Sequence, residues 1–269
     1  MNTLKTHTRP GHKTDYFLVY WTNSTERLGG LLRVTVTPNI EDKAIAAELA
    51  AIQHLLEVQE VLGNNISGNA STKLVVSSGA IRKLQRNQSD KAHLAPYASF
   101  LCTRFAACPI SVDKNTGWFE GVAPAKEEDL LVSGPQDETL NLPGLGSVAV
   151  TRHVLSRFVE RALIDQPADQ AIQIAWKRLR KLAEHHSVRE VSRQTLWAGA
   201  SHNRQDRKEG RYFLNPHMQM VLVITDNTKE GLRLVTTYPV TRHYQLIGPP
   251  ASSTSGEVLS VDNRNQHAH

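Results

Sequence analysis

The feature that most constrains the fold is an apolar stripe at helical spacing in K-A-I-A-A-E-L-A-A-I-Q-H-L-L-E-V-Q-E-V-L, residues 43–62. Ile45, Leu49, Ile52 and Leu56 recur every three or four residues, so they line one face of an α-helix. This spacing predicts a long amphipathic helix with a buried face.

Strand-like runs stand on both sides of this helix. Y-F-L-V-Y-W (16–21) is β-branched and aromatic, and G-G-L-L-R-V-T-V-T-P (29–38) alternates apolar and polar residues. T-K-L-V-V-S-S (72–78) is a further strand candidate, followed by a helix start at 79–85 and a second amphipathic helix over 92–107. The order strand, strand, helix, strand, helix predicts an α/β domain with a mixed sheet.

This order resembles the ribonuclease H-like fold, and the local sequence is similar too. W-T-N-S followed by a glycine pair resembles the first strand and hairpin of that family. A-A-E-L-A-A-I-Q-H-L-L resembles its first long helix, which carries a catalytic glutamate, here Glu48. V-V-S-S-G-A-I resembles the strand that ends in a second aspartate.

The departures from that family bear on function. The resemblance implies hydrolysis by two divalent metals held between several carboxylates. At the matching positions this chain has Thr22 or Asn23, and Ser77 or Ser78. Glu48 alone cannot hold two metals, and its alternative role is an ordinary helix surface residue. We therefore expect a degenerate domain without metal or cofactor, which binds nucleic acid or a protein partner.

The second half predicts an α+β domain, with two helices followed by a four-stranded antiparallel sheet. The helices are expected at 153–164 and 168–186. The strands are expected at 194–200, 211–215, 218–225 and 231–240.

The first of these helices carries His153, Arg157 and Arg161 at four-residue spacing, so the three side chains share one face. Like charges at this spacing disfavour an isolated helix. Either the face meets an anion, or nearby carboxylates such as Glu160 and Asp165 pair with the arginines.

With V-T-T-Y-P on the last strand, this half resembles the barnase/EndoU/colicin/RelE-like metal-independent ribonucleases, especially their phage-borne and toxin relatives. The resemblance covers a little over a third of the chain. It implies RNA cleavage with His153 as general base or acid, Arg157 and Arg161 as phosphate clamps, and Thr237 and Tyr238 as phosphate or proton-donor contacts. The alternatives are capping or packing for His153 and strand-edge packing for Tyr238.

Basic residues concentrate in the same half. Residues 148–248 hold 16 Lys and Arg against 9 Asp and Glu, a net charge of +7 in a chain whose total is +5. A phosphate-binding surface needs such a concentration, and solubility is the plain alternative. The side chains expected to contact nucleic acid are Arg178, Lys181, Arg204, Arg207, Lys208, Arg211 and Arg242.

Composition predicts four segments: the ribonuclease H-like domain over 14–121, an acidic Pro/Gly-rich linker over 122–147, the basic domain over 148–248 and a disordered tail over 249–269. The linker cluster E-E-D (127–129) has the opposite charge to the basic face. We hypothesise that it folds back over that face as an internal inhibitor.

No apolar run is long enough to span a membrane, and the polar N-terminus lacks the core of a secretory signal. Cys102 and Cys108 fit a reducing compartment as buried thiols, so a cytoplasmic location is expected. Two function classes remain open. One is an RNA-cleaving toxin or mobile-element factor with a neutralising or recruiting protein partner, and the other is a non-catalytic nucleic-acid-binding or protein-interaction accessory protein.

Overall fold

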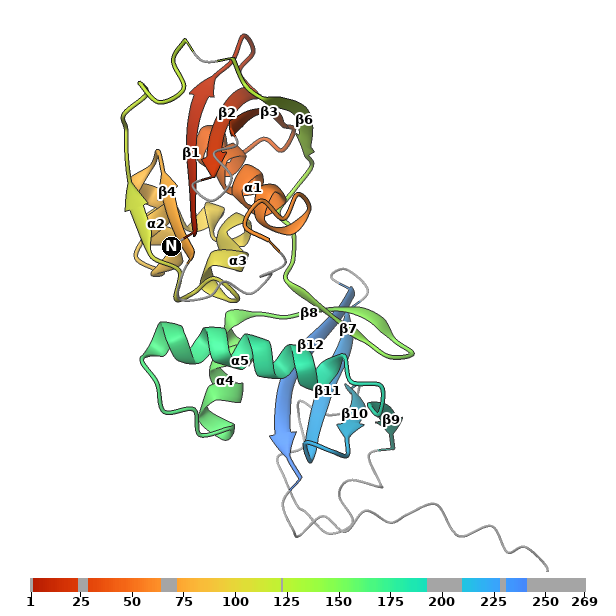
Figure 1. Ribbon diagram of the computed structural model, residues 1–269. Coiled ribbons are helices and arrows are strands. Elements are labelled where there is room, and N and C mark those ends of the chain that lie inside the picture. Colours follow the sequence, from red (N-terminus) through yellow and green to blue (C-terminus); the bar gives the residue numbers. More distant parts are fainter. Residues whose placement is uncertain are drawn as a thin grey trace, which may run out of the picture.

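A computed structural model describes residues 2–23, 29–63, 72–121, 123–192, 210–227 and 231–240. These residues form two mixed sheets of six strands, each packed against helices. Figure 1 shows the first sheet with its helices above the second in the view. The predicted combination of an α/β part and an α+β part is confirmed at this level. Within the described ranges, no helix has both the length and the apolar character to cross a membrane.

Six strands form the first sheet: β1 (Asn2–Pro10), β2 (Tyr16–Asn23), β3 (Gly29–Val36), β4 (Thr72–Val76), β5 (Ile110–Val112) and β6 (Lys126–Val132). Their spatial order is β5-β4-β1-β2-β3-β6. Strands β1, β2 and β3 form an antiparallel meander. Strands β4, β5 and β6 each join in parallel, so the sheet is mixed.

The central strand β1 lies outside the domain predicted to begin at residue 14, so that boundary misses an essential element. The two strands predicted first are β2 and β3. In β1, Leu4 and Thr6 are buried while Lys5 and His7 are half-buried, which is the alternation of a strand. Threonine on the buried face concealed this pattern in a segment whose one large apolar residue is Leu4.

Helices cover one face of this sheet: α1 (Lys43–Glu57), α2 (Gly79–Gln85) and α3 (Ser99–Cys102), with 3-10 turns at Ala92–Leu94 and Pro96–Ala98. Their buried residues belong to one apolar core with the inward residues of β1 to β4 and β6. The predicted helix over 92–107 is instead a series of short turns. Proline at position 96 has no N–H to donate and disfavours helical backbone before it.

The second sheet contains β7 (Thr139–Leu142), β8 (Gly146–Ala149), β9 (Arg189–Val191), β10 (Gly210–Asn215), β11 (Met220–Asn227) and β12 (Gly231–Pro239), and its helices are α4 (Arg152–Arg161) and α5 (Ala168–Ala183). The spatial order is β7-β8-β12-β11-β10-β9. Both helices share a core with one face of this sheet.

This second sheet differs from the predicted four-stranded antiparallel one, because β8 pairs in parallel with β12 and β7 to β9 add to it. The segment 122–147, predicted as a linker, supplies β6, β7 and the start of β8. Its alternating apolar residues Leu140 and Leu142 are buried, but the prolines and acids elsewhere in the segment suggested a loop. The predicted strand 194–200 and the tail 249–269 lie outside the described residues.

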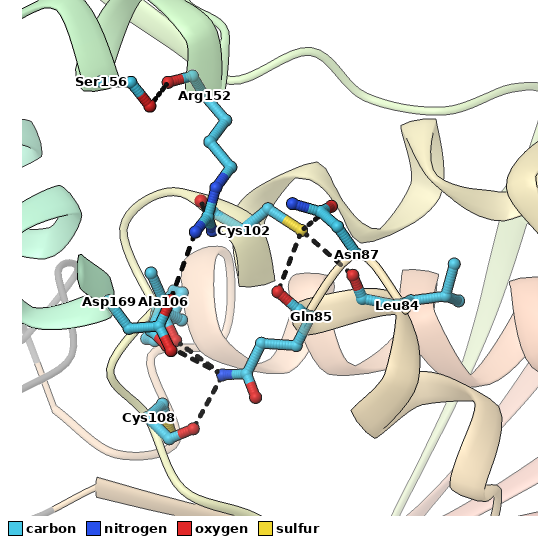
Figure 2. Close-up of polar contacts among 10 residues, drawn as sticks. Leu84, Gln85, Asn87, Cys102, Ala106, Cys108, Arg152, Ser156 and Asp169 are labelled. Atoms are coloured by element: carbon cyan, nitrogen blue, oxygen red, sulfur yellow. Dashed lines mark hydrogen bonds and ion pairs between the residues drawn. The ribbon is translucent and has the colours of Figure 1, made fainter. Parts of the chain in front are cut away.

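Polar side chains join the two halves. The buried Arg104 guanidinium is 2.9 Å from the Glu138 carboxylate just before β7. Figure 2 shows Arg152 of α4, whose Nη1 donates to the Cys102 carbonyl oxygen at 2.9 Å. Both cysteines are buried free thiols, and burial raises the pKa of Cys108 to about 12. Both thiols therefore stay protonated and pack as apolar groups.

Candidate nucleic-acid interface

The three predicted residues of α4 have different surroundings. His153 and Arg157 are exposed, and Arg157 pairs with Glu160 at 3.1 Å, one of the predicted alternatives. Arg161 is half-buried at the end of the helix. Eight residues of α-helix separate His153 from Arg161, about 12 Å along the axis. The two side chains therefore start about two helical turns apart.

Arg161 instead binds the backbone edge of β12. Its Nη1 donates to the Thr236 hydroxyl and to the Thr237 carbonyl oxygen, and its guanidinium carbon lies 4.2 Å from the centre of the Tyr238 ring. Thr237 points to the opposite face of the strand, where its side chain is fully buried. The structure thus brings Arg161 and Tyr238 together, while the side chains of His153 and Thr237 lie elsewhere.

The residues predicted to contact nucleic acid are only partly described. Arg178 and Lys181 are exposed on α5. Arg211 makes two hydrogen bonds to Glu190, at 2.8 and 2.7 Å, and this pairing lowers the pKa of Glu190 and raises that of Arg211. The other predicted contacts, Arg204, Arg207, Lys208 and Arg242, lie outside the described residues.

The acidic cluster 127–129 does not cover the α4 face. It lies on β6, at the edge of the first sheet, where Glu127 and Asp129 both approach Arg33. Glu128 lies 2.8 Å from the His54 imidazole. The proposed internal inhibitor is therefore wrong, because these acids pair with basic side chains of the first half.

Glu48 is buried, with 1 % of its surface exposed, and is not the helix surface residue offered as an alternative. Thr6 Oγ1 donates to its Oε1 at 2.9 Å, the Ser77 N–H donates to the same oxygen at 2.7 Å, and the Ser77 hydroxyl donates to Oε2 at 2.5 Å. Burial raises the pKa of Glu48 despite these hydrogen bonds. Ser77, one of the two residues named for the second-aspartate position, contacts Glu48. The other side chain that contacts it is Thr6 of β1, and not Thr22 or Asn23 of β2.

This constellation does not fit a pair of divalent metals. Two metals need several carboxylates, and Glu48 is the one carboxylate of the three residues, with both oxygens already accepting hydrogen bonds. A second acidic group, formed by Glu41, Asp42 and His93, brings its ligand atoms within 4.8 Å of one another. There Lys91 binds Asp42 at 2.7 Å, so a lysine ammonium already occupies the place of a cation.

The face of the first sheet turned away from α1 carries a surface that sequence reasoning missed. We call it the β1 face and define it by Lys5, His7 and Arg9 of β1, Tyr20 of β2, and Trp118 and Phe119 of the loop after β5. Among the described residues, no helix packs on this side, since α1 to α3 share the opposite core.

Aromatic rings and cations alternate on the β1 face. The Phe119 ring stacks on Tyr20 with centroids 4.2 Å apart and planes 14° apart. The Lys5 ammonium lies 5.0 Å from the Trp118 ring, and the Arg9 guanidinium lies 4.8 Å from the Phe119 ring. Such cation–π contacts hold the charges beside the rings without neutralising them.

Two carboxylates pair with the cations of this face, and burial affects the protonation of its histidine. Lys5 pairs with Asp113 at 2.8 Å and lowers its pKa, while Arg9 pairs with Glu120 and lowers the pKa of that carboxyl. Both pairs are partly open to water, so they are weak and can exchange with another anion. Burial, and then the nearby Arg9, lower the pKa of His7, which leaves this imidazole neutral at pH 7.

A sequence signal for the β1 face exists in L-K-T-H-T-R, residues 4–9. Alternate positions hold Lys5, His7 and Arg9, which a strand places on one side. The signal is weak, because a basic N-terminal segment looks the same whether it is a strand or a tail. The partner aromatics Trp118 and Phe119 are more than a hundred residues away, and no local pattern connects them.

Comparisons of the chain with protein-family models, with curated proteins and with solved structures found no significant match.

Proposed function

We propose that the protein binds single-stranded nucleic acid through the β1 face and does not cleave it with a two-metal site. The observation that carries this proposal is the combination of Lys5 and Arg9 with stacked aromatic rings on a sheet face that no described helix covers. Cationic side chains contact phosphates, and aromatic rings stack with unpaired bases. Here the rings that reach solvent are those of Tyr20 and Trp118, both half-buried, whereas Phe119 is buried. Arg178 and Lys181, exposed on α5, are candidate phosphate contacts of the second half.

The strand arrangement supports the ribonuclease H-like resemblance of the first half. A central β1, antiparallel to β2 and parallel to the strand after the first long helix, is the arrangement expected for such a domain. Thr6, Glu48 and Ser77 then occupy the positions where that family has carboxylates. Since two of the three are hydroxyl residues, we propose that the domain keeps the architecture and has lost the metal-dependent cleavage.

A binding assay that also detects cleavage tests this proposal. Labelled single-stranded RNA is incubated with the full chain, once in excess EDTA and once with Mg²⁺. We expect salt-sensitive binding in both buffers and intact RNA afterwards. Absence of binding at low salt would refute the proposal, and cleavage seen only with Mg²⁺ would show that the Glu48 site still works as a metal-dependent nuclease.

A second candidate function is metal-independent RNA cleavage by the second half. The observation in its favour is the contact between Arg161 and Tyr238, two of the residues expected to bind phosphate. Fragments ending in 2′,3′-cyclic phosphate in EDTA, lost in Tyr238→Phe and in His153→Ala, would support it. The separation of His153 from this pair argues against it, and intact RNA in EDTA would exclude it.

A further inference from the structure

A pocket of about 260 Å³ opens on the β1 face between β2, β3 and the loop after β5. Its walls include the rings of Tyr20, Trp118 and Phe119, the backbone of Gly29 and the ring of Pro124. We propose that this pocket holds one nucleobase of a single-stranded nucleic acid, while Lys5 contacts an adjoining phosphate. The inference rests on the proposed function and names the part of the ligand that the site recognises.

The size and the walls of the pocket favour a base. Pockets for drug-sized ligands measure about 300–1,000 Å³, so this one suits a single flat ring system. Aromatic side chains offer such a ring a stacking surface irrespective of its sequence. Tyr20 and Phe119 already stack on each other, and Trp118 stands edge-on to Phe119 with ring centroids 4.9 Å apart.

Cross-strand pairing places a cation at the mouth of the pocket. Lys5 is directly opposite Thr22, which lines the pocket, and directly paired residues of antiparallel strands stand about 5 Å apart on the same face. The Lys5 side chain is 20 % exposed and its partner Asp113 is 37 % exposed. A phosphate can therefore replace Asp113 at low cost, since partly exposed pairs contribute little.

Glycine keeps this pocket open. Gly29 pairs directly with Thr22, so a side chain at position 29 would point to the same face and into the pocket. A Cβ there would lie 3.3 Å from the Trp21 carbonyl oxygen and 4.0 Å from the Thr22 side chain. Valine therefore requires a shift of a few tenths of an ångström at the Trp21 carbonyl, and its methyl groups would occupy the space of the base.

The test compares two labelled ten-nucleotide strands in EDTA, one of RNA and one with the same ribose-phosphate backbone but no bases. The full chain is titrated into each, and affinity is read from fluorescence anisotropy. We expect the base-bearing strand to bind roughly 5- to 150-fold more tightly, the equivalent of one stacked base. Trp118→Ala and Gly29→Val should abolish this preference, and Lys114→Gln, an exposed lysine of the same loop, should retain it.

The outcomes separate the pocket from the proposed function. Equal affinity for both strands, or a preference that survives in both variants, overturns the base pocket and leaves nucleic-acid binding intact. Failure of the wild-type chain to bind either strand overturns both. Circular dichroism verifies that each variant is folded, and if Trp118→Ala unfolds, Gly29→Val decides the result, because it removes no packed side chain.

Discussion

Replacing the buried Glu48 gives the most demanding test of the structure. Glu48→Ala would leave three donors, from Thr6 and Ser77, without their acceptor. An unsatisfied buried donor costs about 1–3 kcal/mol, and the cavity adds to this, so we expect three such donors to cost at least about 3 kcal/mol. Glu48→Gln keeps an oxygen that accepts from the Thr6 hydroxyl and the Ser77 N–H. The Ser77 hydroxyl can rotate to accept a hydrogen bond from the new amide. The cost of Glu48→Gln at pH 5 should be within about 1 kcal/mol.

The pH dependence follows from the raised pKa of Glu48. A carboxyl whose pKa is higher in the folded than in the unfolded chain holds its proton more tightly when folded. Its contribution to stability is complete below the unfolded pKa, about 4.3, and is lost as the pH rises through the folded pKa. Glutamine does not titrate, so the stability of Glu48→Gln relative to the wild type should increase from pH 5 to pH 8.

Urea unfolding at pH 5, 6.5 and 8, followed by tryptophan fluorescence, measures these differences when the slopes agree. A Glu48→Gln variant as damaged as Glu48→Ala at pH 5 would refute the reasoning. So would a stability difference between Glu48→Gln and wild type that stays constant or falls with pH, because either result means that the carboxyl is ionised in the folded chain.

Further expectations concern other contacts. Arg161→Ala should lower the free energy of unfolding by about 1–3 kcal/mol because it removes the hydrogen bonds to β12. Arg157→Ala, on the same helix face, should change it by less than about 0.5 kcal/mol. Equal effects of the two substitutions in urea unfolding would contradict this. Arg104→Ala should cost about 3–5 kcal/mol in the same assay, since it leaves Glu138 buried without its cation, and a loss below about 1 kcal/mol would contradict the buried pair. Thiol reagents should modify Cys108 only after unfolding, because burial raises its pKa to about 12, and fast labelling of the native chain would disprove the burial.

Local patterns in the sequence predicted the long helices well, although the helix expected over 92–107 is a series of short turns. The stripe of α1 and the two helices of the second half were found within a few residues of their observed bounds, because a helix buries one face at a spacing visible in any short window. The strand β1, whose buried face carries both apolar and polar residues, was missed. In β1 the inward-facing residue Thr6 donates a hydrogen bond to Glu48 instead of adding an apolar side chain to the core. The alternation of apolar and polar residues that predicts a strand was therefore weak.

The candidate site was harder to predict than the helices, because its residues meet through long-range pairing. Arg161 was singled out for its helical spacing, but its partners on β12 follow some 75 residues later. Likewise Lys5 meets Trp118 only because β1 lies between β2 and β4. Charge and spacing in the sequence identified candidate functional side chains. Which of them are neighbours depends on the topology of the sheet.

The salt dependence of single-stranded RNA binding tests the central claim, that the β1 face contacts phosphates. Each phosphate contact contributes about 0.7 to the slope of log affinity against log salt. Lys5→Gln/Arg9→Gln should therefore reduce the slope by about 1.4, while Arg82→Gln/Lys83→Gln, exposed on α2 across the sheet, should leave it unchanged. An unchanged slope in the first variant, or the same reduction in both, would contradict the claim.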